Sequence, residues 1–314
     1  MGKKCIGIDV GGTTVKLGLF EMDGTMLEKW EIPTRKEENG AFILPDAAAS
    51  VKEKLSERGL SLSDLAGAGL GLPGPVMPDG FVGVCVNLGW KNKNPQKELS
   101  ALLDGALVRT GNDANVAALG EMWQGGGKGF SDIVMVTLGT GVGGGVILDK
   151  KIVAGKHGTG GEIGHLRIRE GEKEPCNCGG YGCLEQVASA TGITREARRA
   201  MEQDSSDTEM RKFGADITAK DVLDCAKSED AMACRVMDTV FYYLGWALSV
   251  VSMTVDPEVF VIGGGVSRAG SFLTEGIRKY FDQFTTLSDQ KAEITLAQLG
   301  NDAGIYGAAR LILD

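Results

Sequence analysis

The chain has 314 residues, 43% of them hydrophobic and 24% charged, which is an ordinary composition for a soluble globular protein of about two domains. Its 33 basic and 42 acidic residues give a net charge of −9, so its electrostatics argue against nucleic acid or an anionic membrane as a partner. Glycine, with 47 residues, has about twice its usual share, which indicates many turns at which backbone closely approaches a neighbouring group.

The sequence shows no export signal and no membrane span. Its beginning, MGKKCIGIDV, contains no apolar segment long enough for a signal peptide. The longest apolar run, Val240–Val255, is short for a membrane span and is flanked by Asp238 and Asp256 rather than by Lys or Arg. We therefore expect a buried helix there. Scattered cysteines suit a reducing compartment, and we expect a cytoplasmic protein.

The chain begins with a strand, a turn and a strand. Cys5–Val10 is rich in β-forming residues, Gly11–Thr14 is a turn, and Val15–Phe20 reads as the returning strand. Apolar residues recur at helical spacing within Asn39–Arg58, although Pro45 is tolerated only near the first turn of a helix. The further elements predicted in this half are strands at Thr25–Ile32, Ala66–Leu72, Val82–Val86 and Ala106–Thr110 and helices at Lys97–Leu103 and Val116–Trp123.

A second strand, turn and strand open the other half, at Ile133–Leu138, Gly139–Gly145 and Val146–Leu148. The segment VMVTLGTGVGGGVIL matches the pattern of IGIDVGGTTVKLGLF near the beginning of the chain. This internal repeat predicts two similar α/β halves whose turns face a shared cleft. The remaining predicted elements are helices at Thr191–Met201, Ala219–Ala226, Ala231–Thr254 and Ala303–Leu313 and a strand at Val259–Ile262.

The repeat also suggests where the domains divide. We expect a small N-terminal domain at residues 1–111, completed by the C-terminal helix at 303–314. A larger domain then covers residues 112–302 and carries the cysteine-rich segment described below. The hinges between them are expected near Gly111 and near Gly300 and Asn301.

The two glycine and threonine turns suit a polyphosphate ligand, because they present backbone N–H groups and hydroxyls to one place. Neither is a Walker A loop, since the sequence contains no G-x4-G-K-[ST]. A third glycine turn, Gly263–Gly265, follows a strand and would let an adenine or a ribose lie against backbone. The alternatives are a tight hairpin for each of the first two turns and a plain strand–helix turn for the third.

Asp113 is the candidate catalytic carboxylate. It follows a predicted strand and stands next to Asn112. Transfer of a phosphoryl group to a hydroxyl needs a carboxylate that accepts the hydroxyl proton. The alternative is that Asn112 and Asp113 cap the following helix, and both roles are compatible. Asp9, at the end of the first strand, is a candidate for holding hydrated Mg²⁺.

Three of the seven cysteines lie within eight positions, as Cys176-x-Cys178-x4-Cys183, and His165 precedes them by eleven. Thiolates and imidazole are the ligands that structural zinc prefers, and the intervening glycines allow the backbone to turn tightly. A disulfide would leave one cysteine unpaired, and unconnected buried thiols are the other alternative. We interpret the segment as a zinc loop with one histidine and three cysteine ligands.

Two glutamates flank this loop, Glu162 before His165 and Glu185 after Cys183. A ligating histidine keeps a second ring nitrogen for another partner. The two carboxylates and that nitrogen would therefore face a ligand rich in hydroxyl groups. The alternative is that both glutamates are solvated surface acids, as most glutamates are.

The ordered motifs DVGGTTVK, LGLPGP, NDAN, TLGTGVGGG, GEIGH, CNCGGYGCLE and VIGGGVS resemble those of the ROK family, which comprises repressors, open reading frames and sugar kinases. The resemblance covers nearly the whole chain, and within the family it is greatest to the bacterial glucokinases, for which the following SATGI is also typical. It implies an actin-like, RNase H-like duplicated α/β fold of two domains, with ATP and sugar bound in the cleft between them.

The resemblance further implies an ATP-dependent kinase for the 6-hydroxyl of a hexose, glucose first, with fructose or N-acetylmannosamine as alternatives. The residues that match the family's sites are Asp113 as the base, Gly71, Gly74, Asn112, Glu162, His165 and Glu185 for the sugar, and His165, Cys176, Cys178 and Cys183 for zinc. Those that match its ATP and Mg²⁺ sites are Asp9, Gly11, Gly12, Thr13, Thr14, Lys16, Gly139, Thr140, Gly141, Gly143, Gly263, Gly264 and Gly265.

Two other function classes share these motifs or this fold. Regulators of the family carry a helix-turn-helix before the first strand, for which this sequence leaves no room ahead of Asp9. An actin-like filament or chaperone ATPase would not need the cysteine loop. We expect a kinase without nucleic acid or membrane partners, with sugar and ATP as its small-molecule partners. As in the family, we expect a homo-oligomer, either a dimer or a tetramer.

Overall fold

The computed structural model describes residues 2–313. These residues form two compact units. Among the described residues, unit 1 comprises 2–131, 145–161 and 298–313, and unit 2 comprises Asp132–Gly144 and Glu162–Ala297. Each unit is therefore discontinuous in the sequence.

The first unit is built on a five-stranded sheet with the order β3-β2-β1-β4-β7. Its strands are β1 (Lys4–Val10), β2 (Thr14–Glu21), β3 (Met26–Pro33), β4 (Leu65–Leu72), β5 (Val82–Cys85), β6 (Trp90–Lys93), β7 (Val108–Asn112) and β10 (Lys151–Ile152), and its α-helices are α1 (Glu37–Gly40), α2 (Ile43–Glu57), α3 (Pro95–Leu102), α4 (Asp113–Gln124) and α10 (Ala303–Arg310). β1, β2 and β3 are antiparallel neighbours, whereas β1, β4 and β7 are parallel. β5 and β6 form a separate two-stranded sheet.

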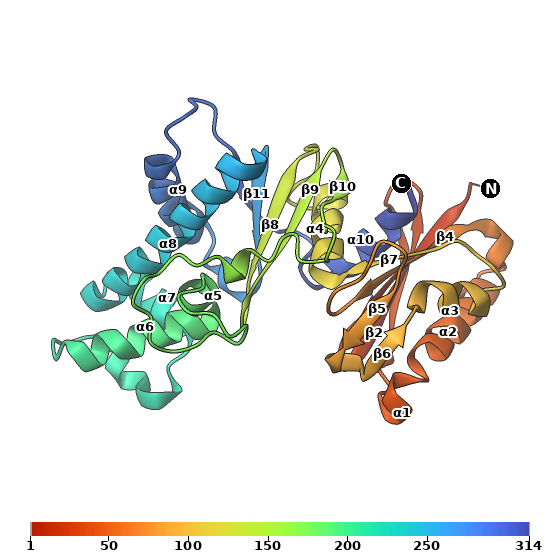
Figure 1. Cartoon of the computed structure of the whole chain (residues 1–314), viewed down its shortest axis with the longest axis horizontal. Coiled ribbons are helices and arrows are strands. Elements are labelled where there is room, and N and C mark those ends of the chain that lie inside the picture. The colour runs from red at the N-terminus through yellow and green to blue at the C-terminus, as the bar shows by residue number, and fades with distance from the viewer. Residues whose placement is uncertain (1, 314) are drawn as a thin grey trace. The chain divides into compact units, whose positions relative to one another are not determined.

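Side chains of β1 alternate between the two faces of this sheet. Ile6 and Ile8 belong to the large buried cluster that includes Val51 of α2. Cys5 packs in a smaller cluster with Ile305 of α10. Helices α2 and α3 accordingly lie along one side of the unit 1 sheet, and α10 and α4 lie along the other (Figure 1).

The second unit has a sheet of the same plan, with the order β10-β9-β8-β11-β12. Its elements are β8 (Ile133–Leu138), β11 (Val259–Gly263), β12 (Glu293–Leu296), α5 (Glu185–Ala188), α6 (Ala190–Gln203), α7 (Ala219–Lys227), α8 (Ala231–Val255) and α9 (Ser271–Phe284), and β9 (Val142–Leu148) runs on into unit 1, which also contains β10. β8, β11 and β12 are parallel. Both sheets thus consist of a hairpin with one more antiparallel strand on one side and two parallel strands on the other, as the internal repeat predicts.

The division between the units differs from the predicted one. The prediction ended the first domain at residue 111, yet α4 belongs to unit 1. The reason is the close packing of α4 on α10, which only glycine permits. A Cβ atom at Gly120 would lie 2.2 Å from the carbonyl oxygen of Ala303, and one at Gly307 would lie 1.6 Å from that of Val116. Gly111, predicted as a hinge, pairs with Gly71 inside the sheet.

Helix α8 contains the longest apolar run of the chain. By length and composition it is the one helix within residues 2–313 that passes the test for a membrane span, and 61% of its most apolar window is buried. Val240, Leu244 and Leu248 are among its fully buried side chains. The run is therefore the core helix that its acidic flanks predict.

Asp9 lies on the α10 face of the sheet, where a Cβ atom at Gly304 would come within 2.5 Å of its carboxylate. Burial and, to a smaller extent, the nearby charge of Asp113 raise the pKa of Asp9 to about 6, although Lys16 acts in the opposite direction. A carboxyl group with a raised pKa supports folding when it is protonated. Its contribution is complete below about pH 4, the usual pKa of an aspartate, and is lost as the pH rises through about 6.

We therefore expect Asp9→Asn to raise the free energy of unfolding of the ligand-free protein by about 1–3 kcal/mol at pH 7.5. At pH 4 the gain should disappear. Urea denaturation at the two pH values measures both effects. Glu53→Gln, which changes an exposed acid of α2, is the control and should show no such difference. An equal gain at both pH values would show that ionisation of Asp9 is not its cause.

Candidate functional site

The candidate site residues of unit 1 gather at the carboxyl edge of its sheet. β1, β4 and β7 are parallel, so their carboxyl ends share one edge. In this register Asp9 pairs with Gly71, Gly71 pairs with Gly111, and Leu72 pairs with Asn112. Segments that are far apart in the sequence are thereby brought together, as the motifs predict.

Asn112 caps helix α4, which leaves Asp113 as the candidate catalytic carboxylate. Asn112 is the N-cap of α4, and its side-chain oxygen accepts hydrogen bonds from the backbone N–H groups of Ala114 and Asn115. Its Nδ2 atom donates to the carbonyl oxygen of Gly74 at 3.1 Å and to Oδ1 of Asp113 at 3.0 Å.

The Asp113 carboxylate is consequently held by fixed donors. Its Oδ1 atom also accepts a hydrogen bond from the N–H of Ala114 at 2.8 Å. The first turn of a helix favours negative charge, because the backbone N–H groups there are unpaired and the helix dipole is positive at that end. The arrangement keeps an oriented carboxylate at the sheet edge beside Asp9, which suits proton abstraction from a bound hydroxyl.

The turn Gly11–Thr14 is fastened to the end of β3. The N–H of Gly11 donates to the carbonyl oxygen of Thr14 at 3.0 Å. The hydroxyl of Thr34 donates to the carbonyl oxygen of Gly11 at 2.8 Å. Nζ of Lys16, another predicted site residue, donates to the carbonyl oxygen of Asn301 at 3.1 Å. A Cβ atom at Gly12 would lie 3.5 Å from Nζ of Lys36. Lys36 therefore brings a cation to this turn, which no sequence motif indicated.

In unit 2 the second turn is held by the segment that follows the cysteines. The N–H of Ala190 donates to the carbonyl oxygen of Gly139 at 2.8 Å. The hydroxyl of Thr191 donates to the backbone carbonyl oxygen of Thr140. The N–H of Val142 donates to Oε2 of Glu185 at 3.0 Å. A Cβ atom at Gly141 would lie 2.1 Å from the same oxygen, so a larger residue there would displace the Glu185 carboxylate.

The third glycine turn lies beside the second. β11 is parallel to β8, and Gly263 pairs with Thr137. Gly264 has a φ of +84°, and a Cβ atom there would lie 2.5 Å from the carbonyl oxygen of Leu138. Both turns therefore stand at the carboxyl edge of the unit 2 sheet, which matches the arrangement in unit 1.

A cavity of about 920 Å³ adjoins the second turn. Its lining includes Thr140 and Gly141 of the turn, Thr191 and Arg195 of α6, and Thr218 before α7. Sequence reasoning missed the last three residues, because no motif connects α6 and α7 with the turn. The α6 helix begins at Ala190, so its N-terminal end lies at this cavity.

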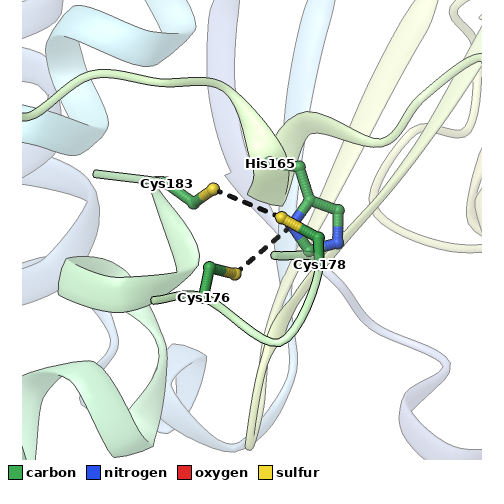
Figure 2. A group of neighbouring side chains, drawn as sticks. All are labelled: His165, Cys176, Cys178 and Cys183. Atoms are coloured by element: carbon green, nitrogen blue, oxygen red, sulfur yellow. Dashed lines mark hydrogen bonds between the residues drawn. The ribbon is translucent and has the colours of Figure 1, made fainter. Parts of the chain in front are cut away.

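His165 and the three cysteines converge as predicted (Figure 2). Their ligand atoms all lie within 4.8 Å of one another. Nδ1 of His165 is 3.7 Å from Sγ of Cys176, and Sγ of Cys178 is 3.7 Å from Sγ of Cys183. A disulfide would need a separation of about 2.05 Å, and all three thiols are free.

These separations fit a tetrahedral metal centre. A metal–sulfur distance of about 2.3 Å places the sulfur atoms of a tetrahedron about 3.8 Å apart. Glycine makes the tight loop possible, since Gly179 and Gly182 have φ values of +82° and +72°. The set of three thiols and one imidazole is the donor chemistry of a structural zinc site.

The cluster also places the two flanking glutamates. Nε2 of His165, on the side of the ring away from Cys176, is 4.0 Å from Oε2 of Glu162. Oε1 of Glu185 is 3.7 Å from Sγ of Cys176. Glu185 therefore links the cluster to the second turn and is not a solvated surface acid. Glu162, with its side chain 57% exposed, remains open to solvent or to a ligand.

Comparison with known proteins places this arrangement in a family. The model of the ROK family matches residues 5–314. The chain is 43% identical over 316 residues to a glucokinase of Halalkalibacterium halodurans, covering 98% of this chain and 94% of that protein. It is 37% identical over 317 residues to a glucokinase of Thermotoga maritima, with coverages of 98% and 97%.

A solved structure agrees with these relatives. The ROK family glucokinase of Streptomyces griseus, determined in complex with glucose and AMPPNP, is 30% identical and superposes with a TM-score of 0.73, covering 98% of each chain. The likeness confirms the predicted actin-like α/β fold of two domains. With the matched motifs, the duplicated sheet and these relatives in agreement, the chain belongs to the ROK family.

Proposed function

We propose that this chain is an ATP-dependent kinase that phosphorylates the 6-hydroxyl of glucose. The observation that carries the proposal is the Asp113 carboxylate, which is oriented by Asn112 and Ala114 at the carboxyl edge of the unit 1 sheet. The relatives named glucokinase, at 43% and 37% identity over nearly the whole chain, support glucose as the acceptor.

In this mechanism Asp113 accepts the proton of the 6-hydroxyl as the oxygen attacks the γ-phosphorus of ATP. The bond between that phosphorus and the β,γ-bridging oxygen breaks, and ADP leaves. The residues that bind the sugar are Asn112, Glu162, His165 and Glu185, together with the backbone at Gly71 and Gly74.

Backbone N–H groups of the turns Gly11–Thr14 and Gly139–Gly143 bind the phosphates of ATP. The 920 Å³ cavity beside the second turn, together with Gly263–Gly265, receives the nucleoside. Asp9 would hold Mg²⁺ through water, and the ion would neutralise phosphate charge. A cation would suit this place, because the negative charge of Asp113 raises the pKa of Asp9 and a bound cation would offset the repulsion between the two carboxylates.

The cysteine–histidine cluster is proposed to bind a structural Zn²⁺ ion. His165 would use Nδ1 for the metal and keep Nε2 on the side of Glu162. The ion would fix the direction of the imidazole ring and hold together the segment that carries Glu162 and Glu185. We further propose a homo-oligomer, as expected from the family, and a cytoplasmic location, as expected from the scattered cysteines. Light scattering and cell fractionation would test them.

Asp113→Asn is expected to lower kcat by ~10²–10⁴-fold, because the amide cannot accept the proton. Glucose binding should persist, since the helix cap is Asn112 and Asn at position 113 can still accept the hydrogen bond of Ala114. Steady-state kinetics and titration calorimetry with glucose measure the two effects. Asp104→Asn, in an exposed part of unit 1, is the control. A loss of less than about tenfold would exclude Asp113 as the base.

Replacing Cys176, Cys178 or Cys183 by Ser is expected to abolish zinc binding, which should amount to one ion per wild-type chain. Elemental analysis of protein purified without chelators measures the content. Cys234→Ser is the matched control, because Cys234 is a free cysteine outside the cluster and should leave the zinc in place. Wild-type protein without zinc would contradict the metal assignment.

Glucose is expected to be preferred over N-acetylmannosamine by kcat/KM. The carboxylates of Glu162 and Glu185 are acceptors, and an acceptor that a bound sugar shields from water without offering it a donor can cost up to ~10⁴-fold. Mannose should be discriminated against less, because an epimer moves a hydroxyl but keeps it. Comparing kcat/KM for the three sugars decides the point. A higher value for N-acetylmannosamine would refute glucose as the substrate while leaving the kinase class intact.

A further inference from the structure

The two halves of the cysteine–histidine cluster come from segments that the sequence separates. His165 ends a short 3₁₀ helix (Ile163–His165), and Cys176 follows it only after residues 166–175. These intervening residues contain no α-helix or strand. A loop without regular structure must be fixed by side chains if its two ends are to stay close. The question is which side chains fix this one.

The loop is attached to α6 by two bidentate ion pairs. Arg169 of the loop donates to both carboxylate oxygens of Glu196 on α6, at 2.6 and 2.7 Å. Glu172 of the loop accepts from both terminal nitrogens of Arg199 on α6, at 2.9 Å each. The polarity is reversed between the pairs, and Arg199 also contacts Glu196 at 3.3 Å. We call Arg169, Glu172, Glu196 and Arg199 the ion-pair clamp.

Burial distinguishes the ion-pair clamp from ordinary surface ion pairs. The side chains of Glu172 and Glu196 are only 2% and 9% exposed. Hydrogen bonds from Arg199 lower the pKa of Glu172 to about 2, so this carboxylate stays ionised throughout the neutral range. Surface pairs contribute little to stability, whereas bidentate pairs that are shielded from water fix geometry strongly.

Other contacts carry this geometry onward to the cysteines. The side-chain oxygen of Gln186 accepts from the N–H of Cys183 at 3.2 Å, and its Nε2 donates to the carbonyl oxygen of Glu174 at 3.0 Å. Gln186 thus joins the segment before Cys176 to the segment that carries Cys183. The N–H groups of Ile168 and Arg169 both donate to the carbonyl oxygen of Gly182. The clamped loop therefore lies directly against the cysteine-bearing turn.

We propose that the ion-pair clamp positions the loop between His165 and Cys176 and so determines how tightly the cysteine–histidine cluster holds its metal. This proposal rests on the proposed metal site and adds residues that touch neither metal nor substrate. The four charged residues are positioning residues. Partners outside the first ligand sphere typically contribute about 10–100-fold to metal affinity.

The test measures Zn²⁺ affinity, by competition with a chromogenic chelator, in wild type and in Glu172→Gln/Arg199→Gln. The double substitution removes both charges together, because removing one alone would leave a buried charge without its partner. We expect Zn²⁺ affinity to fall about 10–100-fold and kcat to return to the wild-type value in excess Zn²⁺. The matched control is Lys220→Gln/Asp224→Asn, an ion pair on α7 whose side chains are 83% and 54% exposed, which should leave Zn²⁺ affinity unchanged.

Further variants keep the result decisive. Glu172→Asp retains the charge and should bind Zn²⁺ more tightly than the double variant but less tightly than wild type. If the double variant does not fold, Arg199→Lys, which keeps the charge but loses the bidentate geometry, takes its place and should also lower Zn²⁺ affinity. A lower melting temperature with unchanged Zn²⁺ affinity would show a merely structural role and overturn the proposal. Wild-type protein that binds no Zn²⁺ would overturn the metal site itself, which is a different outcome from a metal-binding wild type with unaffected variants.

Discussion

Direct contact between backbones, made possible by glycine, is the constraint on which unit 1 depends. Helix α10 lies on the sheet so closely that a Cβ atom at Gly7 would come within 1.9 Å of the carbonyl oxygen of Ile305, and one at Gly69 within 1.6 Å of that of Ala308. On its other side α10 meets α4 through Gly120 and Gly307. Because Asp113 begins α4 and Asp9 lies against Gly304 of α10, these contacts also bear on where the two carboxylates lie.

This packing explains part of the sequence that pattern reading misjudged. The high glycine content was interpreted as a sign of turns, and the turns at Gly11 and Gly139 are indeed present. Several other glycines, however, lie inside helices and strands, where they allow backbones to touch. The periodicity of apolar residues gives no information at those positions, because glycine has no side chain. It therefore does not predict that α4 packs on α10 or where unit 1 ends.

Local patterns were more informative where the chemistry is local. The internal repeat gave the two similar sheets, and the spacing of the cysteines gave the cluster with His165. α9 and β12 were missed, although α9 has buried residues at Leu273, Ile277 and Phe281. The contact of Glu185 with Val142 was beyond sequence reasoning, because the two residues meet only through the tertiary fold. The position of Lys36 beside Gly12 has the same origin.

The discontinuity of unit 1 has a consequence for how the chain is made. The segment that contains α10 follows the whole of residues 162–297 of unit 2. During synthesis, one face of the central strands β1 and β4 therefore stays uncovered until α10 has been made, after the whole of unit 2. Contacts of such long sequence separation form slowly, and exposed strands are prone to aggregate in the meantime. The whole of unit 2 precedes α10 in the chain, so its sheet can form before the sheet of unit 1 is covered on both faces.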